Sequence, residues 1–116
     1  FSNNVMYDFR PFGLVVDYSS DLIINNNVLI KVVERTTIEA NWNYVDRKGG
    51  YAICAVYASS ASCTNVTVND NIAAGIAMAG FWAPMQNCDE ENESFRGNVA
   101  HSVAGTNDGG NGAIFF

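Results

Sequence analysis

A five-residue pattern of apolar and polar positions recurs along the chain. An apolar residue, two variable positions, an asparagine and a second apolar residue follow one another at five places. The copies are Phe1–Val5, Ile24–Val28, Ile38–Trp42, Val68–Ile72 and Phe95–Val99. Asparagine tolerates left-handed backbone and hydrogen-bonds its neighbours, so it is typical of corners between short strands. The pattern therefore predicts strands joined at repeated asparagine corners.

A second repeat consists of a glycine followed by a short apolar run. Its copies are Gly13–Val16, Gly50–Ile53, Gly80–Trp82 and Gly112–Phe115, which begin 37, 30 and 32 residues apart. The asparagines at 4, 27, 71 and 98 lie 23, 44 and 27 residues apart. Spacings of about 22 to 30 residues suit one coil of a parallel β-solenoid. The interval of 44 indicates either two coils or one coil with a long loop.

Together the repeats predict a single all-β domain over residues 1–116, a parallel β-helix of about three to four coils. Each strand would pair with its equivalent one coil away, at about 4.8 Å. Alternation along Asn65–Asn69 places Val66 and Val68 inside and Thr67 outside. A fixed offset from the repeated asparagine predicts the inward residues. They are Ile24, Val28, Val66, Val68, Ile72, Phe95 and Val99.

The asparagines Asn27, Asn71 and Asn98 occupy the same place in successive repeats. At one bend of stacked coils, their amides can hydrogen-bond along the axis of the stack. We therefore interpret them as a structural ladder at the corner and not as catalytic residues.

Composition agrees with a chain of strands and turns. Val and Ile together number 20 against 3 Leu, with 15 Asn and 10 Gly, and helix-forming residues are sparse. The net charge of −6 counts against nucleic acid as a partner. The sequence has no apolar run long enough to span a membrane. Because the chain starts at Phe1 and within a repeat, we expect a fragment or one subunit of a larger assembly.

Two stretches carry a family resemblance. Residues 12–28, FGLVVDYSSDLIINNNV, resemble the coil G-I-V-x-H-G-x-x-D-V-x-I-x-N-N-V of the β-helical region in fibrocystin and its relatives. The stretches at 71–75, 79–82 and 95–102 resemble the order N-x-x-A-G, G-F-W and F-x-x-N-x-A-H-S shared with fibrocystin-like proteins and cell-surface hyaluronidase relatives. The resemblance covers residues 12–28 and 48–116. It implies a right-handed parallel β-helix that faces the outside of the cell, although those proteins are much longer and bring a glycine-rich domain.

Cysteines occur at 54, 63 and 88, and an odd number leaves at least one unpaired. Cys54 lies in an apolar run and is expected to be a buried thiol. Cys63 and Cys88 each follow a glycine strand, so they could meet at one corner of adjacent coils. A bridge between Cys63 and Cys88 fits an oxidising compartment, and Cys54 to Cys63 is the competing pairing.

The sequons at Asn65 and Asn92 predict N-glycosylation and an extracellular location. Asn92 lies in the acidic segment Asp89–Glu93, which is expected to be exposed, so its modification is favoured over that of Asn65. The same segment lacks the glycine turn and alternating ligands of known calcium loops. We therefore expect no metal site and no cofactor.

An enzyme that cleaves polysaccharide would need an acid and a base or nucleophile close together. The carboxylates expected to face outward do not share one phase of the repeat, and His101 is more typical of a turn cap. These carboxylates are Asp17, Asp21, Glu39, Asp46, Asp70 and Asp108. Aromatic residues would stack on sugars only if exposed. They are Trp42, Tyr44, Tyr51, Tyr57, Phe81 and Trp82.

Neither terminus contains a polar capping helix, so both ends of the stack are expected to present open strand edges. We expect a structural or adhesive module that assembles end to end with neighbouring coils or identical subunits. The alternative is a carbohydrate-binding or carbohydrate-cleaving β-helix fragment.

Overall fold

The computed structural model describes residues 1–10, 13–16, 19–33, 50–53, 64–77, 79–83, 94–105 and 114–115. These residues form eleven short strands and no helix. The strands are β1 (Val5–Phe9), β2 (Leu14–Val16), β3 (Ser20–Asn25), β4 (Val28–Val32), β5 (Tyr51–Ile53), β6 (Thr64–Asn69), β7 (Ile72–Ile76), β8 (Phe81–Trp82), β9 (Phe95–Arg96), β10 (Val99–Val103) and β11 (Ile114–Phe115).

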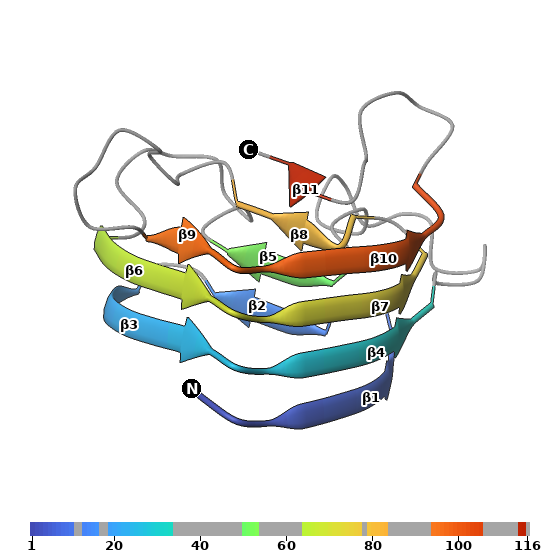
Figure 1. Ribbon diagram of the computed structural model, residues 1–116, viewed down its shortest axis with the longest axis horizontal. Helices are drawn as coiled ribbons and strands as arrows, with labels where there is room; N and C mark the ends of the chain where they lie inside the picture. The colour runs from blue at the N-terminus through green and yellow to red at the C-terminus, as the bar shows by residue number, and fades with distance from the viewer. Residues whose placement is uncertain are drawn as a thin grey trace.

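The strands belong to three sheets, which the chain visits in a fixed rotation (Figure 1). The first sheet has the order β1-β4-β7-β10, the second β2-β5-β8-β11 and the third β3-β6-β9. After each circuit through the three sheets, the chain returns to the first sheet beside its previous strand. All strand pairs in the described residues are parallel. The prediction of an all-β chain with parallel pairing is therefore confirmed.

Both sequence repeats coincide with positions in this rotation. Val5, Val28, Ile72 and Val99, each following a repeated asparagine, pair in one register across the first sheet. The apolar runs after the repeated glycines supply the four strands of the second sheet. Because Val28 pairs directly with Ile72, the 44 residues between Asn27 and Asn71 make one circuit and not two. The repeat at Ile38–Trp42 lies outside the described residues.

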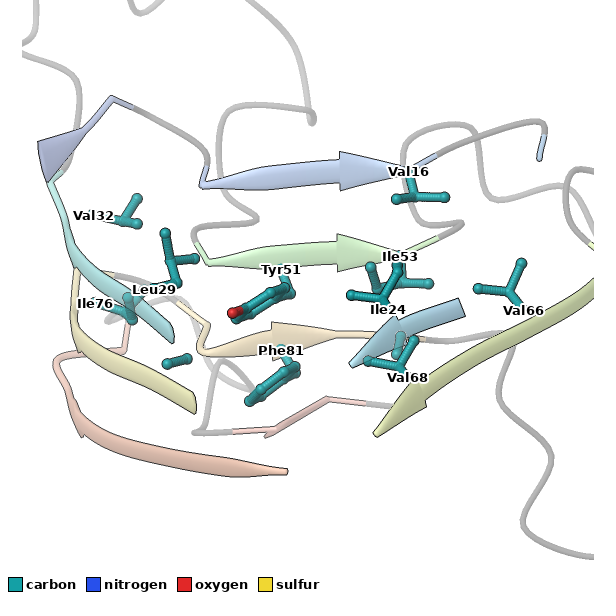
Figure 2. Packing of buried hydrophobic residues seen from close by; sticks show 12 residues of the cluster. Val16, Ile24, Leu29, Val32, Tyr51, Ile53, Val66, Val68, Ile76 and Phe81 are labelled. Carbon is teal, nitrogen blue, oxygen red and sulfur yellow. The ribbon is translucent and has the colours of Figure 1, made fainter. Parts of the chain in front are cut away.

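The inward side chains of the three sheets meet in a single core (Figure 2). Ile24 and Ile53 are fully buried. Tyr51 stacks on Phe81 with ring centroids 4.7 Å apart, and the edge of Phe95 meets the Phe81 ring at 5.6 Å. The Tyr51 hydroxyl donates a hydrogen bond to the carbonyl of Ile72 at 3.3 Å. Burial raises the pKa of this hydroxyl, so it stays protonated.

The predicted inward residues are correct in the third sheet and shifted in the first. Ile24, Val66 and Val68 are buried. Phe95, on β9 of the same sheet, is half-buried and packs against the core. In the first sheet, Val28 and Ile72 are only half-buried. Val99 is 50% exposed, so its inward assignment is wrong.

The cause of the shift is the orientation of the repeated asparagine. Asn27 and Asn71 are themselves buried, so alternation turns the next residue outward and the one after it inward. Leu29 and Ala73, two positions after these asparagines, are accordingly fully buried.

Left-handed backbone conformations recur in register, and six of the residues that adopt them are Asn or Asp. All described residues with positive φ, except Gly105, fall in three columns. The columns are Asn3, Asn26, Asp70 and Gly97; Asp8, Lys31, Gly75 and Ser102; and Asp21 with Asn65. Asn and Asp adopt this conformation more readily than other side chains. At Gly97 a Cβ atom would come within 2.0 Å of the Asp70 Oδ1, so a larger residue there would require the Asp70 side chain to move.

Two adjacent isoleucines of β3 provide a matched test of which face is buried. Ile24 is fully buried and Ile23 is 58% exposed. We expect Ile24→Ala to lower the free energy of unfolding by about 2 to 5 kcal/mol, because it leaves a cavity in the core. Ile23→Ala should change it by less than about 0.5 kcal/mol. Urea unfolding of both variants measures the difference, and equal losses would contradict the orientation of β3.

Candidate functional site

A column of asparagine side chains follows the corner between the third and first sheets. Asn4, Asn27, Asn71 and Asn98 lie on successive circuits, one residue before β1, β4, β7 and β10. The backbone N and the Nδ2 of each asparagine both donate to the Oδ1 of the next one. The two distances are 3.1 and 2.9 Å from Asn4, 3.0 and 2.9 Å from Asn27, and 3.0 and 3.0 Å from Asn71.

The Nδ2 groups of the column also donate to backbone carbonyls. Asn27 donates to Phe1 O at 3.1 Å, Asn71 to Ile24 O at 3.0 Å, and Asn98 to Val68 O at 2.7 Å. Burial of an amide is costly unless its polar atoms are hydrogen-bonded. The column satisfies the amides of Asn27 and Asn71, which are fully buried. The column therefore acts as a structural element that joins successive circuits. Asn4, which shares the motif and the spacing, is a fourth member beyond the three ladder residues predicted.

The first sheet ends in two strands that pair on one side only within the described part of the chain. β1 pairs with β4, and β10 pairs with β7 (Figure 1). We call their outer sides the β1 edge and the β10 edge. Val5 on β1 is 75% exposed and Val99 on β10 is 50% exposed, whereas Val28 and Ile72 at the same register are half-buried.

The outer face of the first sheet is partly apolar. The side chains of Val5, Tyr7, Ile30 and Val99 on this sheet are all exposed. Lys31 Nζ lies 3.1 Å from Asp8 Oδ2 and 5.3 Å from the centre of the Tyr7 ring. The hydrogen bond that Lys31 donates to the Asp8 carboxylate is the main cause that raises the pKa of Lys31. Because the pair is exposed, salt screens it, and it orients side chains more than it stabilises the fold.

The other predicted site residues are only partly within the described structure. Asn65 is exposed, and its Nδ2 donates to Asp21 Oδ1 at 2.7 Å. His101 is exposed, with its Nδ1 3.3 Å from the Ser102 hydroxyl. The remaining predicted sites lie outside the described residues. They are Asn92, Cys54, Cys63, Cys88 and the acidic segment Asp89–Glu93.

The aromatic residues considered for sugar stacking lie only partly within the described residues. Tyr51 and Phe81 are fully buried, so neither ring can stack on a sugar. Trp82 is half-buried, and Trp42, Tyr44 and Tyr57 lie outside the described residues. No three His, Cys, Asp or Glu side chains of the described part gather as metal ligands. None of its segments forms a helix with the length and apolar character needed to cross a bilayer.

Comparison with known proteins gives no relative from which a function could be transferred: no family model matches the chain, and no curated protein or solved structure matches it significantly. The resemblance to the fibrocystin family therefore stays a prediction. The candidate sites are the asparagine column and the two open edges of the first sheet.

The buried column predicts a pH-dependent penalty for the variant Asn71→Asp. The variant loses the donor that bonds Asn98 Oδ1 and Ile24 O, so an ionised carboxylate would face carbonyl oxygens. Folding then raises the pKa of the new carboxyl. Above an unfolded-state pKa of about 3.9, the unfolded chain releases its proton first, and stability falls relative to wild type as pH rises.

We expect Asn71→Asp to lower the free energy of unfolding by about 3 kcal/mol or more at pH 7 and by less at pH 4. Asn26→Asp, at an exposed corner position where Asp also fits, is the matched control and should change little. Urea unfolding at both pH values measures the two differences. Equal losses for Asn71→Asp at pH 4 and pH 7 would show that the carboxyl is not buried among acceptors.

Proposed function

We propose that the chain is a right-handed parallel β-helix of about three to four coils that serves as an extracellular structural or adhesive module. It assembles end to end with neighbouring coils or identical subunits, and it carries N-glycans. The observation that carries this proposal is the presence of an open strand edge at each end of the first sheet in the described residues.

The rotation of the chain through three parallel sheets supports the β-helix. Each circuit lies directly beside the previous one, as the rise from β1 through β4 and β7 to β10 in Figure 1 shows. Connections between parallel strands of one sheet are right-handed in nearly all proteins, which supports the hand. The resemblance to the β-helical region of fibrocystin agrees with both features.

The open edges support assembly. An edge strand presents a row of unpaired N–H and C=O groups, which is a template for pairing with another strand. In the described part of the chain, the backbone N–H of Val5 is an unpaired donor of this kind on β1. The equivalent N–H of Val28 donates to Asn4 O at 2.9 Å, whereas that of Val5 has no such partner among the described residues. Proteins built of stacked repeats need capping segments at both ends to remain separate, soluble molecules. No described segment pairs with the β1 edge or the β10 edge.

The exposure of Asn65 supports a glycan. Its side chain lies at the surface, where a transferase and a sugar have access. An N-linked sugar replaces one hydrogen of Nδ2 and leaves the other, so the bond to Asp21 Oδ1 is compatible with modification.

Assembly through the β1 edge predicts opposite results for two substitutions of Val5. At tens of micromolar, we expect the wild-type chain to sediment as oligomers or filaments. Val5→Pro removes the outward N–H at the first residue of an edge strand, where proline is tolerated, and should shift the protein toward monomer. Val5→Ala keeps the N–H and should assemble like wild type. Analytical ultracentrifugation distinguishes them, and a stable wild-type monomer would refute the proposed function.

The covalent chemistry is tested by intact mass of the chain secreted from eukaryotic cells. We expect a loss of mass on treatment with an N-glycosidase, from Asn92 and Asn65, and alkylation of Cys63 and Cys88 only after reduction. Asn65→Gln and Asn92→Gln, each alone, assign the occupied sites. A mass unchanged by both the glycosidase and the reductant would contradict an extracellular glycoprotein.

A further inference from the structure

The asparagine column has a direction, and its two ends are chemically different. Each asparagine donates from its backbone N and its Nδ2 to the next Oδ1, in the order Asn4, Asn27, Asn71, Asn98. Asn4 is the first member, and within the described residues its Oδ1 accepts no hydrogen bond. Asn98 is the last member, and within the same residues its backbone N–H donates none. One end of the column thus presents an acceptor and the other end a donor.

The backbone beside the column forms a second series of hydrogen bonds between circuits, and these are donated in the opposite direction. The residue after each asparagine donates its N–H to the carbonyl of the previous asparagine, at 2.9 Å for Val28 to Asn4 and 2.8 Å for Ile72 to Asn27 and for Val99 to Asn71. By the same pattern, Val5 N–H is a donor without an acceptor at the β1 edge. Asn98 O is the matching acceptor at the β10 edge.

We propose that the partner at these edges is a second copy of this chain, docked head to tail so that β1 of one copy continues the first sheet beside β10 of the other. This inference rests on the proposed function, since it specifies the contact through which assembly occurs. Asn98 N donates to the next copy's Asn4 Oδ1, and that copy's Val5 N donates to Asn98 O. The strand register is the one that occurs three times within the chain, so Val5 lies opposite Val99 and Tyr7 opposite His101.

Exposure of the end residues favours the same contact. Val5 and Val99 are 75% and 50% exposed, while Val28 and Ile72, which occupy their register inside the sheet, are half-buried. Head-to-tail docking turns both valines into interior positions of a longer sheet. The second sheet continues as well, because β2 and β11 are its two end strands. A head-to-head contact would instead bring two Asn4 acceptors together, without the donors that Asn98 supplies.

Disulfide trapping tests this register. Val5→Cys in one chain and Val99→Cys in another are mixed in equal amounts and oxidised. Register partners on adjacent parallel strands lie about 4.8 Å apart, within the range that a disulfide spans. Within one chain the two positions lie on the first and fourth strands, about 14 Å apart, so a bond between them is intermolecular. Peptide mapping separates it from bonds of the native cysteines.

The matched control pairs Val5→Cys with His101→Cys, which is exposed on the same strand but displaced by two residues, about 6.6 Å. We expect about tenfold more cross-linking of position 5 to position 99 than to position 101. All three substituted side chains are exposed, and urea unfolding verifies that each variant folds.

The cross-linking pattern and the oligomeric state together distinguish three outcomes. Oligomers that cross-link position 5 equally to 99 and 101, or mainly to position 5 of another copy, would overturn the head-to-tail register while leaving the proposed assembly intact. A chain that sediments as a monomer would overturn both. Preferential cross-linking of 5 to 99 supports the inference.

Discussion

The hydrogen bonds of the buried asparagine column are the constraint on which the stack depends. Asn27 and Asn71 are fully buried, and each must find two donors for its Oδ1 and two acceptors for its Nδ2. Only the equivalent asparagine of the adjacent circuit supplies the side-chain part of this set. A slip of one residue would leave a buried amide unpaired and would turn apolar side chains of the strands outward. The column therefore determines the register of the circuits.

Each corner between the third and first sheets consists of two residues with different structural roles. This explains why an asparagine preceded by Asn, Asp or Gly recurs in the chain. The first residue adopts a left-handed backbone and turns the chain, and the second points inward and joins the column. The pairs are Asn3-Asn4, Asn26-Asn27, Asp70-Asn71 and Gly97-Asn98. The first position accepts Asn, Asp or Gly because it requires only backbone conformation, whereas the second is always Asn in these four circuits.

The parallel strands were predictable from sequence because their signals are local and repeated. The asparagine motif and the glycine runs mark the strands of the first and second sheets. The outward orientation of Val99 was not predictable from sequence, because the asparagine before it points inward only when it bonds an asparagine of another circuit. The 44-residue interval was ambiguous for a similar reason: spacing alone does not reveal that Val28 and Ile72 are neighbours. Asn4 carried the same motif as the ladder residues, but its place in the column depends on a contact with Asn27.

The direct pairing of Val28 with Ile72 has a consequence for how such chains diverge. Circuits of 23, 44 and 27 residues stack in a single register, so the length between sheets is independent of the contacts that hold the sheets together. The length varies only at the junctions from the first to the second sheet and from the second to the third, so insertions and deletions there are compatible with the stack. The asparagine corner between the third and first sheets has two residues in every circuit, and a deletion there or inside a strand would break the register. Peptides grafted into those two junctions would therefore leave the pairing of the strands and the column unchanged.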